Sequence, residues 1–464
     1  MALLRPGMRV HLVGIGGIGL SAIARVLHGW GYVVSGSDQR ESALTRALQA
    51  EGIPVSIGHR ADNIADAELL IISSAIPEDN VEVVAARRRE LTVAKREQVL
   101  GELTADKTTI AVAGTHGKTT TSAMIAWILD QVGLEPTFIV GGVLQNMGTN
   151  ARAGHGPHFV IEADEYDRTF LGLRPGVAVI TTLEHDHPDC YPTFDDMRAA
   201  FGAFANQMRP QGVLVVCGDD EAARQVAESQ ADLGRRVVTY GVGEQWDWHA
   251  RGVQLGSNAA FEVWQGGRLA GMCALQIPGL HNLLNALAAL AVSAEVGVEF
   301  SAAAAALTRY RGTARRFEIK GHKAGITVVD DYAHHPTEIR ATLAAARLKY
   351  PGRSIWAVFQ PHTYSRTAAL LDDFATAFGD ADHVLVTSIY AARETDSLGI
   401  SGRDLVARTH HPDVRYVASR AEAVEALLQR VQPGDVVLTL GAGDGYLIGD
   451  QLLQRLQNGG GGKE

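Results

Sequence analysis

Three segments of the chain share one pattern, in which a short apolar run passes into a glycine-rich or polar turn and then into a helical pattern. The runs are Arg9–Val13, Thr109–Ala113 and Ile326–Val329. Apolar strand, turn and helix, repeated with helical spacers, is typical of mostly parallel sheets with flanking helices. Binding sites in such folds lie at the carboxyl ends of the strands. The pattern therefore predicts an α/β fold with three domains and three binding edges.

The domain boundaries follow from two polar stretches between these segments. A charged, amphipathic stretch over residues 82–107 is expected to bridge the first two segments, and residues 310–316 the last two. We place the boundaries near residues 105 and 315, within several residues. The predicted domains cover residues 1–105, 106–314 and 315–464. The outer two are expected to be Rossmann-like, around a central P-loop-type ATPase domain.

Composition narrows the classes of protein. The 464 residues are 46% apolar and 20% charged, as in a globular protein of several domains. A net charge of −10 without a basic face argues against a nucleic-acid partner. Three widely spaced cysteines, no secretory signal and no long apolar run favour a cytoplasmic protein without a membrane span. The Ala-rich stretch Ala286–Val298 predicts a buried helix, and Gly459–Gly462 a flexible tail.

The second apolar run leads into a glycine loop that predicts a phosphate site. Its residues are Gly114, Thr115, His116, Gly117, Lys118, Thr119 and Thr120. Backbone N–H groups of such a loop converge on phosphate oxygens at a helix N-terminus. Lys118 would neutralise phosphate charge, and the Thr119 hydroxyl would bind Mg²⁺. Val112 occupies the place of the first glycine in the strict P-loop pattern, so a shorter form, G-T-x-G-K-T, is present.

The first apolar run leads into a second glycine loop, formed by Gly14, Gly16, Gly17 and Gly19, with Asp38 about 20 residues on. Read alone, this spacing is a dinucleotide fingerprint and supports an NAD-dependent oxidoreductase. The same close backbone approach serves any diphosphate. The spacing by itself leaves both ligands open.

Further motifs follow the ATP loop in a fixed order. They are Glu162-Ala163-Asp164-Glu165, His281-Asn282-Leu283-Leu284-Asn285-Ala286, Arg315-Arg316-Phe317-Glu318, residues 330–336 and residues 359–366. With them the chain resembles the Mur ligase family over nearly its whole length. The resemblance implies ATP-dependent ligation through an acyl phosphate in peptidoglycan precursor synthesis, with ATP and Mg²⁺. It also implies that the N-terminal loop, Asp38, Ser73 and Ser74 hold a UDP-sugar rather than NAD.

The resemblance also implies roles for individual residues. The expected ATP contacts beyond the loop are His281, Asn282, Asn285 and Arg316, and the expected Mg²⁺ ligands are Thr119, Glu162 and His187. The expected catalytic residues are Lys118, Glu162, His187, His334, His362 and Arg366. From the residues alone, the loop around His187 also fits capping carboxylates or a zinc site with Cys190, and the amides of Asn282 and Asn285 also fit helix caps. The general base stays open among His334, His335 and His362.

The absence of lysine between Lys118 and Lys320 selects a branch of the family. Most relatives use a carbamylated lysine there, so the resemblance favours the branch that joins L-alanine to UDP-N-acetylmuramate, as a monomer or homodimer. The alternatives are the tripeptide-adding ligases of cell-wall recycling and, outside the enzymes, a non-catalytic nucleotide-binding module. Thr363 stands where some members of this branch have arginine. Arg366 or another group is then expected to bind the alanine carboxylate.

Overall fold

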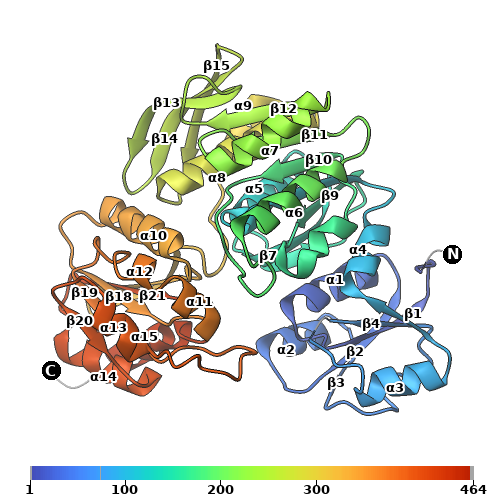
Figure 1. The fold of residues 1–464 in the computed structure, drawn as a ribbon, viewed down its shortest axis with the longest axis horizontal. Coiled ribbons are helices and arrows are strands. Elements are labelled where there is room, and N and C mark those ends of the chain that lie inside the picture. The colour runs from blue at the N-terminus through green and yellow to red at the C-terminus, as the bar shows by residue number, and fades with distance from the viewer. Residues whose placement is uncertain (1–2, 74, 460–464) are drawn as a thin grey trace. The chain divides into compact units, whose positions relative to one another are not determined.

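The structure is a computed structural model that describes residues 3–73 and 75–459 (Figure 1). Its packing divides the chain into two compact units. Residues 1–183, 198–248 and 287–306 form the first unit, and residues 184–197, 249–286 and 307–464 form the second. Ser74 and residues 460–462 of the predicted tail lie outside the described residues, whereas Gly459 ends the last helix.

The N-terminal sheet belongs to the first unit and is parallel, in the order β3-β2-β1-β4-β5. Its strands are β1 (Arg9–Val13), β2 (Val33–Asp38), β3 (Val55–Ile57), β4 (Leu69–Ile72) and β5 (Thr92–Lys95). The connecting helices are α1 (Ile18–Gly29), α2 (Ala43–Ala50), α3 (Val81–Arg88) and α4 (Arg96–Leu103). Helices α1 and α3 lie on opposite faces of the sheet (Figure 1), as right-handed crossovers from a central β1 require.

The expectation of a bridge over residues 82–107 is wrong. Most of α3 and the whole of β5 and α4 lie within it, and β5 pairs in parallel with β4. The reason is the edge position of β5, which buries only Ala94 of its four residues. A strand that buries one side chain carries too weak an apolar pattern to be found from the sequence.

The central sheet of the first unit has the strand order β12-β11-β10-β6-β9-β7-β8. These strands are β6 (Thr108–Ala113), β7 (Thr137–Leu144), β8 (Thr149–Arg152), β9 (His158–Glu162), β10 (Val177–Ile180), β11 (Val213–Cys217) and β12 (Arg236–Gly241). The accompanying helices are α5 (Lys118–Gln131), the 3₁₀ helix η1 (Tyr166–Gly172), α6 (Phe194–Asn206) and α7 (Glu221–Asp232). Strand β6 lies between β10 and β9 and is parallel to both. The ATP loop follows β6 and therefore begins at the carboxyl end of a strand in the middle of the sheet.

Three strands follow along the chain and lie in the order β15-β14-β13, namely β13 (Trp248–Leu255), β14 (Ala259–Gln265) and β15 (Arg268–Leu275), and the β14–β15 pair is antiparallel. Helices α8 (Leu280–Glu295) and α9 (Phe300–Thr308) come next, and their residues 287–306 belong to the first unit. The predicted helix over Ala286–Val298 is thus confirmed, but it begins six residues earlier. The described helices include none long and apolar enough to cross a membrane.

The C-terminal sheet of the second unit has the order β16-β17-β21-β18-β19-β20, parallel except for the β16–β17 pair. Its strands are β16 (Glu318–Lys323), β17 (Ile326–Asp331), β18 (Ile355–Phe359), β19 (His383–Val386), β20 (Val414–Tyr416) and β21 (Val436–Leu440). Its helices are α10 (Pro336–Lys349), α11 (Tyr364–Ala369), α12 (Leu371–Phe374), α13 (Gly402–Arg408), α14 (Arg420–Arg430) and α15 (Tyr446–Gly459).

Alternation along β18 shows how helices cover both faces of this sheet. Ile355 and Phe359 belong to the core formed with α10, α12 and α13, whereas Trp356 and Val358 belong to the core formed with α14 and α15. Successive side chains of a strand point to opposite faces, so a strand buried on both sides is apolar throughout. The prediction of three α/β domains with mostly parallel sheets is confirmed.

Candidate active site

The ATP loop joins β6 to α5 and needs glycine at two positions. Gly114 has φ of +136° and Gly117 has φ of +82°, a region that side chains rarely adopt. A Cβ on Gly114 would also collide with Oγ1 of Thr181, which follows β10. The Thr115 amide donates to the Thr182 carbonyl at 2.7 Å. The loop is therefore held against the neighbouring strand, with α5 beginning at Lys118.

Lys118 is largely buried, with 14% of its side chain exposed. Its Nζ donates to the carbonyl oxygens of Gly114 at 2.6 Å and Thr115 at 3.2 Å, and to Glu165 Oε1 at 2.8 Å. Burial by itself lowers the pKa of Lys118, but the carboxylates of Glu165 and Glu162 outweigh it, so the pKa is raised above its ordinary value. Lys118 is consequently a fixed positive charge inside the loop.

Thr119 and Glu162 meet as the sequence predicts. The Thr119 hydroxyl donates to Glu162 Oε1 at 3.0 Å, and Glu162 Oε2 accepts from the Gly141 amide at 2.7 Å. A side chain at Gly141 would collide with this carboxylate. Hydroxyl and carboxylate oxygens are the donors that a hard cation such as Mg²⁺ prefers. The pair is suited to a cation beside the loop.

The segment after Glu162 is strained. Asp164 Oδ1 accepts from the Tyr166 amide at 3.1 Å, and the two residues that follow in η1, Asp167 and Arg168, have φ of +54° and +55°. Two consecutive non-glycine residues in this region cost free energy, and such strain concentrates at functional sites. The bonds from Lys118 to Glu165 and from Thr119 to Glu162 hold the acidic segment against the ATP loop and help to impose this conformation.

The N-terminal glycine loop brings together the residues expected to hold a diphosphate. Gly14 has φ of +84°, and a Cβ there would lie 3.3 Å from Ser73 Oγ. The Gly16 amide donates to Asp38 Oδ2 at 2.9 Å, and Gly17 stands immediately before α1 without a capping side chain. Because the glycines of this loop carry no side chain, an anion has room next to the backbone at the N-terminus of the helix.

In the second unit, Asp186 and Arg366 form a buried ion pair. The Arg366 Nε and Nη2 atoms donate to Asp186 Oδ1 at 2.9 and 2.8 Å, and the side chains are 6% and 5% exposed for Arg366 and Asp186. Burial would raise the pKa of Asp186, but the charge of Arg366 holds it far below its usual range. His187, which has φ of +55°, donates its amide to the same Oδ1 at 2.7 Å.

Two histidines of this cluster have different tautomers. Arg366 Nη1 lies 3.2 Å from His362 Nδ1, so that ring nitrogen accepts and His362 carries its proton on Nε2. His334 Nδ1 lies 2.9 Å from the Tyr332 carbonyl, so it donates and leaves Nε2 as an acceptor. Burial lowers the pKa of His334 to about 3, while burial and Arg366 lower that of His362 to about 4. Both rings are neutral near pH 7, with centroids 5.8 Å apart.

The expected nucleotide contacts of the second unit lie on α8 and before β16. Asn282 Nδ2 donates to the Pro278 carbonyl at 2.7 Å, and Asn285 Nδ2 to Asn282 Oδ1 at 3.3 Å. Burial lowers the pKa of His281 to about 4. The Arg316 guanidinium lies 5.2 Å from the centre of the Tyr332 ring. The two amides have internal partners, as the capping alternative predicted, and the ATP contacts stay predictions.

Apart from the nucleotide contacts on α8 and at Arg316, the structure groups the predicted residues into three sets. The glycine loop, Asp38 and Ser73 form one, the ATP loop with Glu162 a second, and His187, His334, His362 and Arg366 a third in the other unit. The sequence reasoning missed Glu165, Asp186 and Arg96 as their partners. Glu165 and Asp186 stand next to predicted residues, and Arg96 follows β5 at the edge that carries Gly14 and Asp38, so position relative to strand ends was the available signal.

Comparisons with known proteins cover nearly the whole chain. Residues 9–108 match a family model described as the Mur ligase family catalytic domain, residues 112–293 the Mur ligase middle domain and residues 315–443 the Mur ligase, glutamate ligase domain. A UDP-N-acetylmuramate–L-alanine ligase of Roseiflexus castenholzii is 44% identical, over 97% of this chain and 98% of that protein. One from Syntrophotalea carbinolica is 46% identical, with 97% and 98% covered.

Two solved structures are similar along the same length. A UDP-N-acetylmuramate-alanine ligase of Thermotoga maritima gives a TM-score of 0.83 at 31% identity, covering 97% of this chain and 100% of that one. A murein peptide ligase of Psychrobacter arcticus gives a TM-score of 0.74 at 25% identity, covering 97% and 99%.

Proposed function

Since the chain belongs to the Mur ligase family and is an ATP-dependent ligase, we propose that it joins L-alanine to the carboxylate of UDP-N-acetylmuramate. The reaction is a step of peptidoglycan precursor synthesis. The observation that carries the proposal is the Lys118 loop with its Thr119–Glu162 pair, in a chain 44% identical to relatives named for this reaction.

The residues of the first unit fit ATP and Mg²⁺. Glycines 114 and 117 permit the backbone conformation of a phosphate loop, and Lys118 begins the helix that points its positive end at the loop. The Thr119 hydroxyl and the Glu162 carboxylate are the ligands proposed for one Mg²⁺, and His187 is proposed as a ligand of a second Mg²⁺. When bound, the metal would spread the negative charge of the phosphates. Lys118 supplies a permanent positive charge for the same purpose.

The reaction follows from the poor leaving group of a carboxylate. A carboxylate oxygen of the sugar attacks the γ-phosphorus of ATP, the bond to the β-phosphate oxygen breaks, and ADP leaves. The neutral amine of L-alanine then attacks the carbonyl carbon of the acyl phosphate. A C–N bond forms, the C–O bond to phosphate breaks, and one amine proton passes to a base. The product is the amide, with inorganic phosphate released.

We propose that His334 accepts a hydrogen bond from the alanine amine and orients it for attack. Its Nδ1 donates to the Tyr332 carbonyl, so Nε2 is available as an acceptor on a neutral ring. His362 has the opposite tautomer and presents an Nε2–H donor, which suits a developing negative oxygen. The proposal therefore separates the two histidines by role: His334 accepts from the amine and His362 donates to oxygen.

The ligand assignments to domains are part of the same proposal. The UDP-sugar binds residues 1–105 through Gly14, Gly16, Gly17, Gly19, Asp38 and Ser73. ATP binds residues 106–314, with Arg316 as a contact from beyond the boundary. L-Alanine binds residues 315–464. The oligomeric state, a monomer or a homodimer, and the cytoplasmic location stay predictions.

One alternative has an observation in its favour. The murein peptide ligase of Psychrobacter arcticus is similar over nearly the same length, at lower identity and TM-score than the alanine ligase of Thermotoga maritima. A chain of this second kind would attach an intact peptide to the same sugar acid. The two candidates differ only in the attacking amine, so a comparison of amine substrates separates them.

The test is a phosphate-release assay with UDP-N-acetylmuramate, Mg-ATP and, in turn, L-alanine, glycine, L-serine and the tripeptide. We expect the highest kcat/KM with L-alanine. Preference for the tripeptide would replace the proposal by its alternative. Release of phosphate with none of the four amines would contradict both.

A further inference from the structure

Arg96 lies at the carboxyl edge of the N-terminal sheet and has no role in the proposed reaction so far. It begins α4 directly after β5. The glycine loop after β1 and Asp38 at the end of β2 occupy the same edge, because the carboxyl ends of parallel strands meet there. Arg96 is thus a cation beside the loop proposed for the UDP-sugar.

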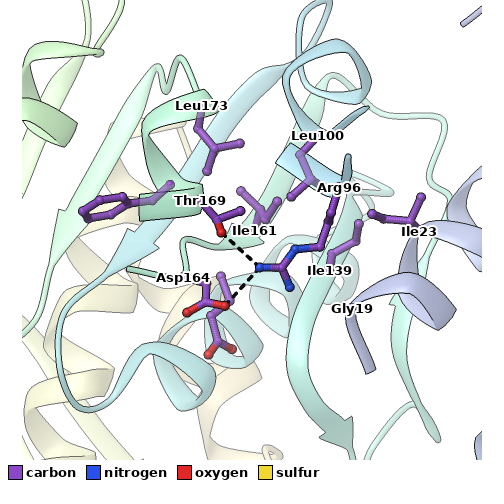
Figure 2. A pocket seen from close by; sticks show the side chains of 11 residues that line it. Gly19, Ile23, Arg96, Leu100, Ile139, Ile161, Asp164, Thr169 and Leu173 are labelled. Atoms are coloured by element: carbon purple, nitrogen blue, oxygen red, sulfur yellow. Dashed lines mark hydrogen bonds and ion pairs between the residues drawn. The ribbon is translucent and has the colours of Figure 1, made fainter. Parts of the chain in front are cut away.

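The guanidinium of Arg96 faces two different segments. Its Nη2 donates to Asp164 Oδ2 at 3.2 Å and to Thr169 Oγ1 at 3.3 Å (Figure 2). A Cβ on Gly19 would lie only 2.8 Å from Nη1, so any side chain at position 19 would displace the arginine. Within residues 3–73 and 75–459, Nε and Nη1 make no hydrogen bond. Nη2 is therefore engaged, and Nη1, on the Cδ side of the guanidinium, is open beside the start of α1.

A small pocket surrounds this arginine. Its lining includes Gly19, Arg96, Glu162, Asp164 and Thr169 (Figure 2), and its volume is about 50 Å³. Such a volume holds a few water molecules or one small polar group, and it is too small for a nucleotide. The Arg96 side chain is 27% exposed, so its charge is partly desolvated but reachable from solvent.

We propose, resting on the function proposed above, that Arg96 binds the diphosphate of the UDP-sugar through Nη1 while Nη2 keeps its bond to Asp164. Nη1 lies against Gly19 in the first turn of α1, where the helix N-terminus also attracts phosphate. A hydrogen bond from the charged Nη1 group to a phosphate oxygen is charge-assisted and therefore strong. Glycine at position 19 is then required, because a side chain there would push the guanidinium away from the diphosphate.

The arrangement also links the two phosphate sites. Asp164 belongs to the segment whose Glu162 binds Thr119 and whose Glu165 binds Lys118. A diphosphate that fixes Arg96 fixes Asp164 through the same guanidinium. Arg96 is consequently a binding residue for the sugar nucleotide and a positioning residue for the ATP loop, and binding of the two nucleotides is coupled.

The test compares UDP and uridine binding by calorimetry for the full chain and for Arg96→Ala, Arg96→Lys, Asp164→Asn and Arg9→Ala. Arg9 is the matched control, since it begins β1 at the opposite edge of the sheet and pairs with Asp66 and Glu68. We expect Arg96→Ala to weaken UDP about 10- to 100-fold, the range of charge-assisted hydrogen bonds. Arg96→Lys should recover part of the loss, uridine binding should not change, and Arg9→Ala should bind UDP as the unaltered chain does.

Asp164→Asn separates anion binding from a merely structural ion pair. Under the proposal it leaves UDP affinity equal or higher, because Arg96 loses a competing carboxylate, but it abolishes the gain in UDP affinity caused by a non-hydrolysable Mg-ATP analogue. Equal weakening of UDP binding by Arg96→Ala and Asp164→Asn would overturn the proposal. So would a loss confined to UDP-N-acetylmuramate with UDP unaffected, which would assign Arg96 to the sugar carboxylate. A chain that binds UDP through Arg96 but ligates no amine would instead overturn the proposed function.

Discussion

Replacing Asp186 by Asn tests whether the buried Asp186–Arg366 pair holds the third site together. The substitution keeps the size of the side chain but removes the charge that accepts from Arg366 at 2.8 and 2.9 Å. Both side chains are at most 6% exposed, so the arginine is left as a buried charge without a counter-ion. Breaking one partner of such a pair costs about 3–5 kcal/mol, and Asn still accepts a neutral hydrogen bond, so we expect a loss near 3 kcal/mol.

The assay is native-state hydrogen exchange at the amides of α11, which reports local opening without a two-state assumption for a chain of several domains. A double-mutant cycle with Arg366→Met should give a coupling energy of at least about 2 kcal/mol. The exposed pair Asp372–Arg408 is the matched control, with side chains 78% and 58% exposed and an expected coupling below about 0.5 kcal/mol. Equal coupling in the two cycles would refute the reasoning.

The same pair predicts a pH dependence. Because the folded chain holds the pKa of Asp186 below its unfolded value, the contribution of the pair is complete above about pH 5 and is lost as the pH falls toward the folded pKa. Protection of the α11 amides should therefore decrease below about pH 4 in the unaltered chain and much less in Asp186→Asn.

Three further predictions concern the reaction. Lys118→Ala should abolish phosphate release and retain UDP-sugar binding, whereas Lys107→Ala should leave both unchanged; turnover by Lys118→Ala would contradict the mechanism. Gly114→Ala should weaken Mg-ATP at least about tenfold because its Cβ meets Thr181, whereas Gly133→Ala, also at a positive φ (+78° against +136° at Gly114) but in open space, should not; equal ATP affinities would exclude the steric argument. Because the pKa of His362 is about 4, its ring stays neutral from pH 8 to pH 6. His362→Gln should therefore lower the rate without changing the shape of the pH–rate profile in that range. An acid limb near pH 6.5 that disappears in this variant would be evidence against a neutral His362.

The sequence predicted those parts of the fold that carry a strong local pattern. Strand β1 lies at the predicted residues, and β6 and β17 begin within one residue of prediction, because each is mostly buried and mostly apolar. The glycine loops were found because positive φ favours glycine, and glycines are visible in the sequence. The predicted family and the predicted three-domain fold are confirmed by the matches to three Mur ligase domain models.

Partners between distant segments were beyond the sequence. Arg96 and Asp164 are 68 residues apart, and Asp186 and Arg366 are 180 residues apart, so no periodicity connects them. The order of strands in a sheet decides which loops meet, and that order is a long-range property. The sequence predicted which edges carry chemistry, but not which charges on those edges neutralise each other.

The contacts of Arg366 change how the departure at Thr363 is understood. The sequence left Arg366 or another group to bind the alanine carboxylate, but the Nε and Nη2 atoms of Arg366 donate to Asp186 and its Nη1 donates to His362. A carboxylate from the substrate would have to displace a buried aspartate that accepts two hydrogen bonds from Arg366, at the cost of a second buried anion. Thr363 accepts from the Arg366 amide and caps α11 despite its φ of +65°. Thr363 therefore caps the helix that carries Arg366. Arg366 in turn fixes His362 in its Nε2–H tautomer. The alanine carboxylate consequently needs a donor other than these two residues.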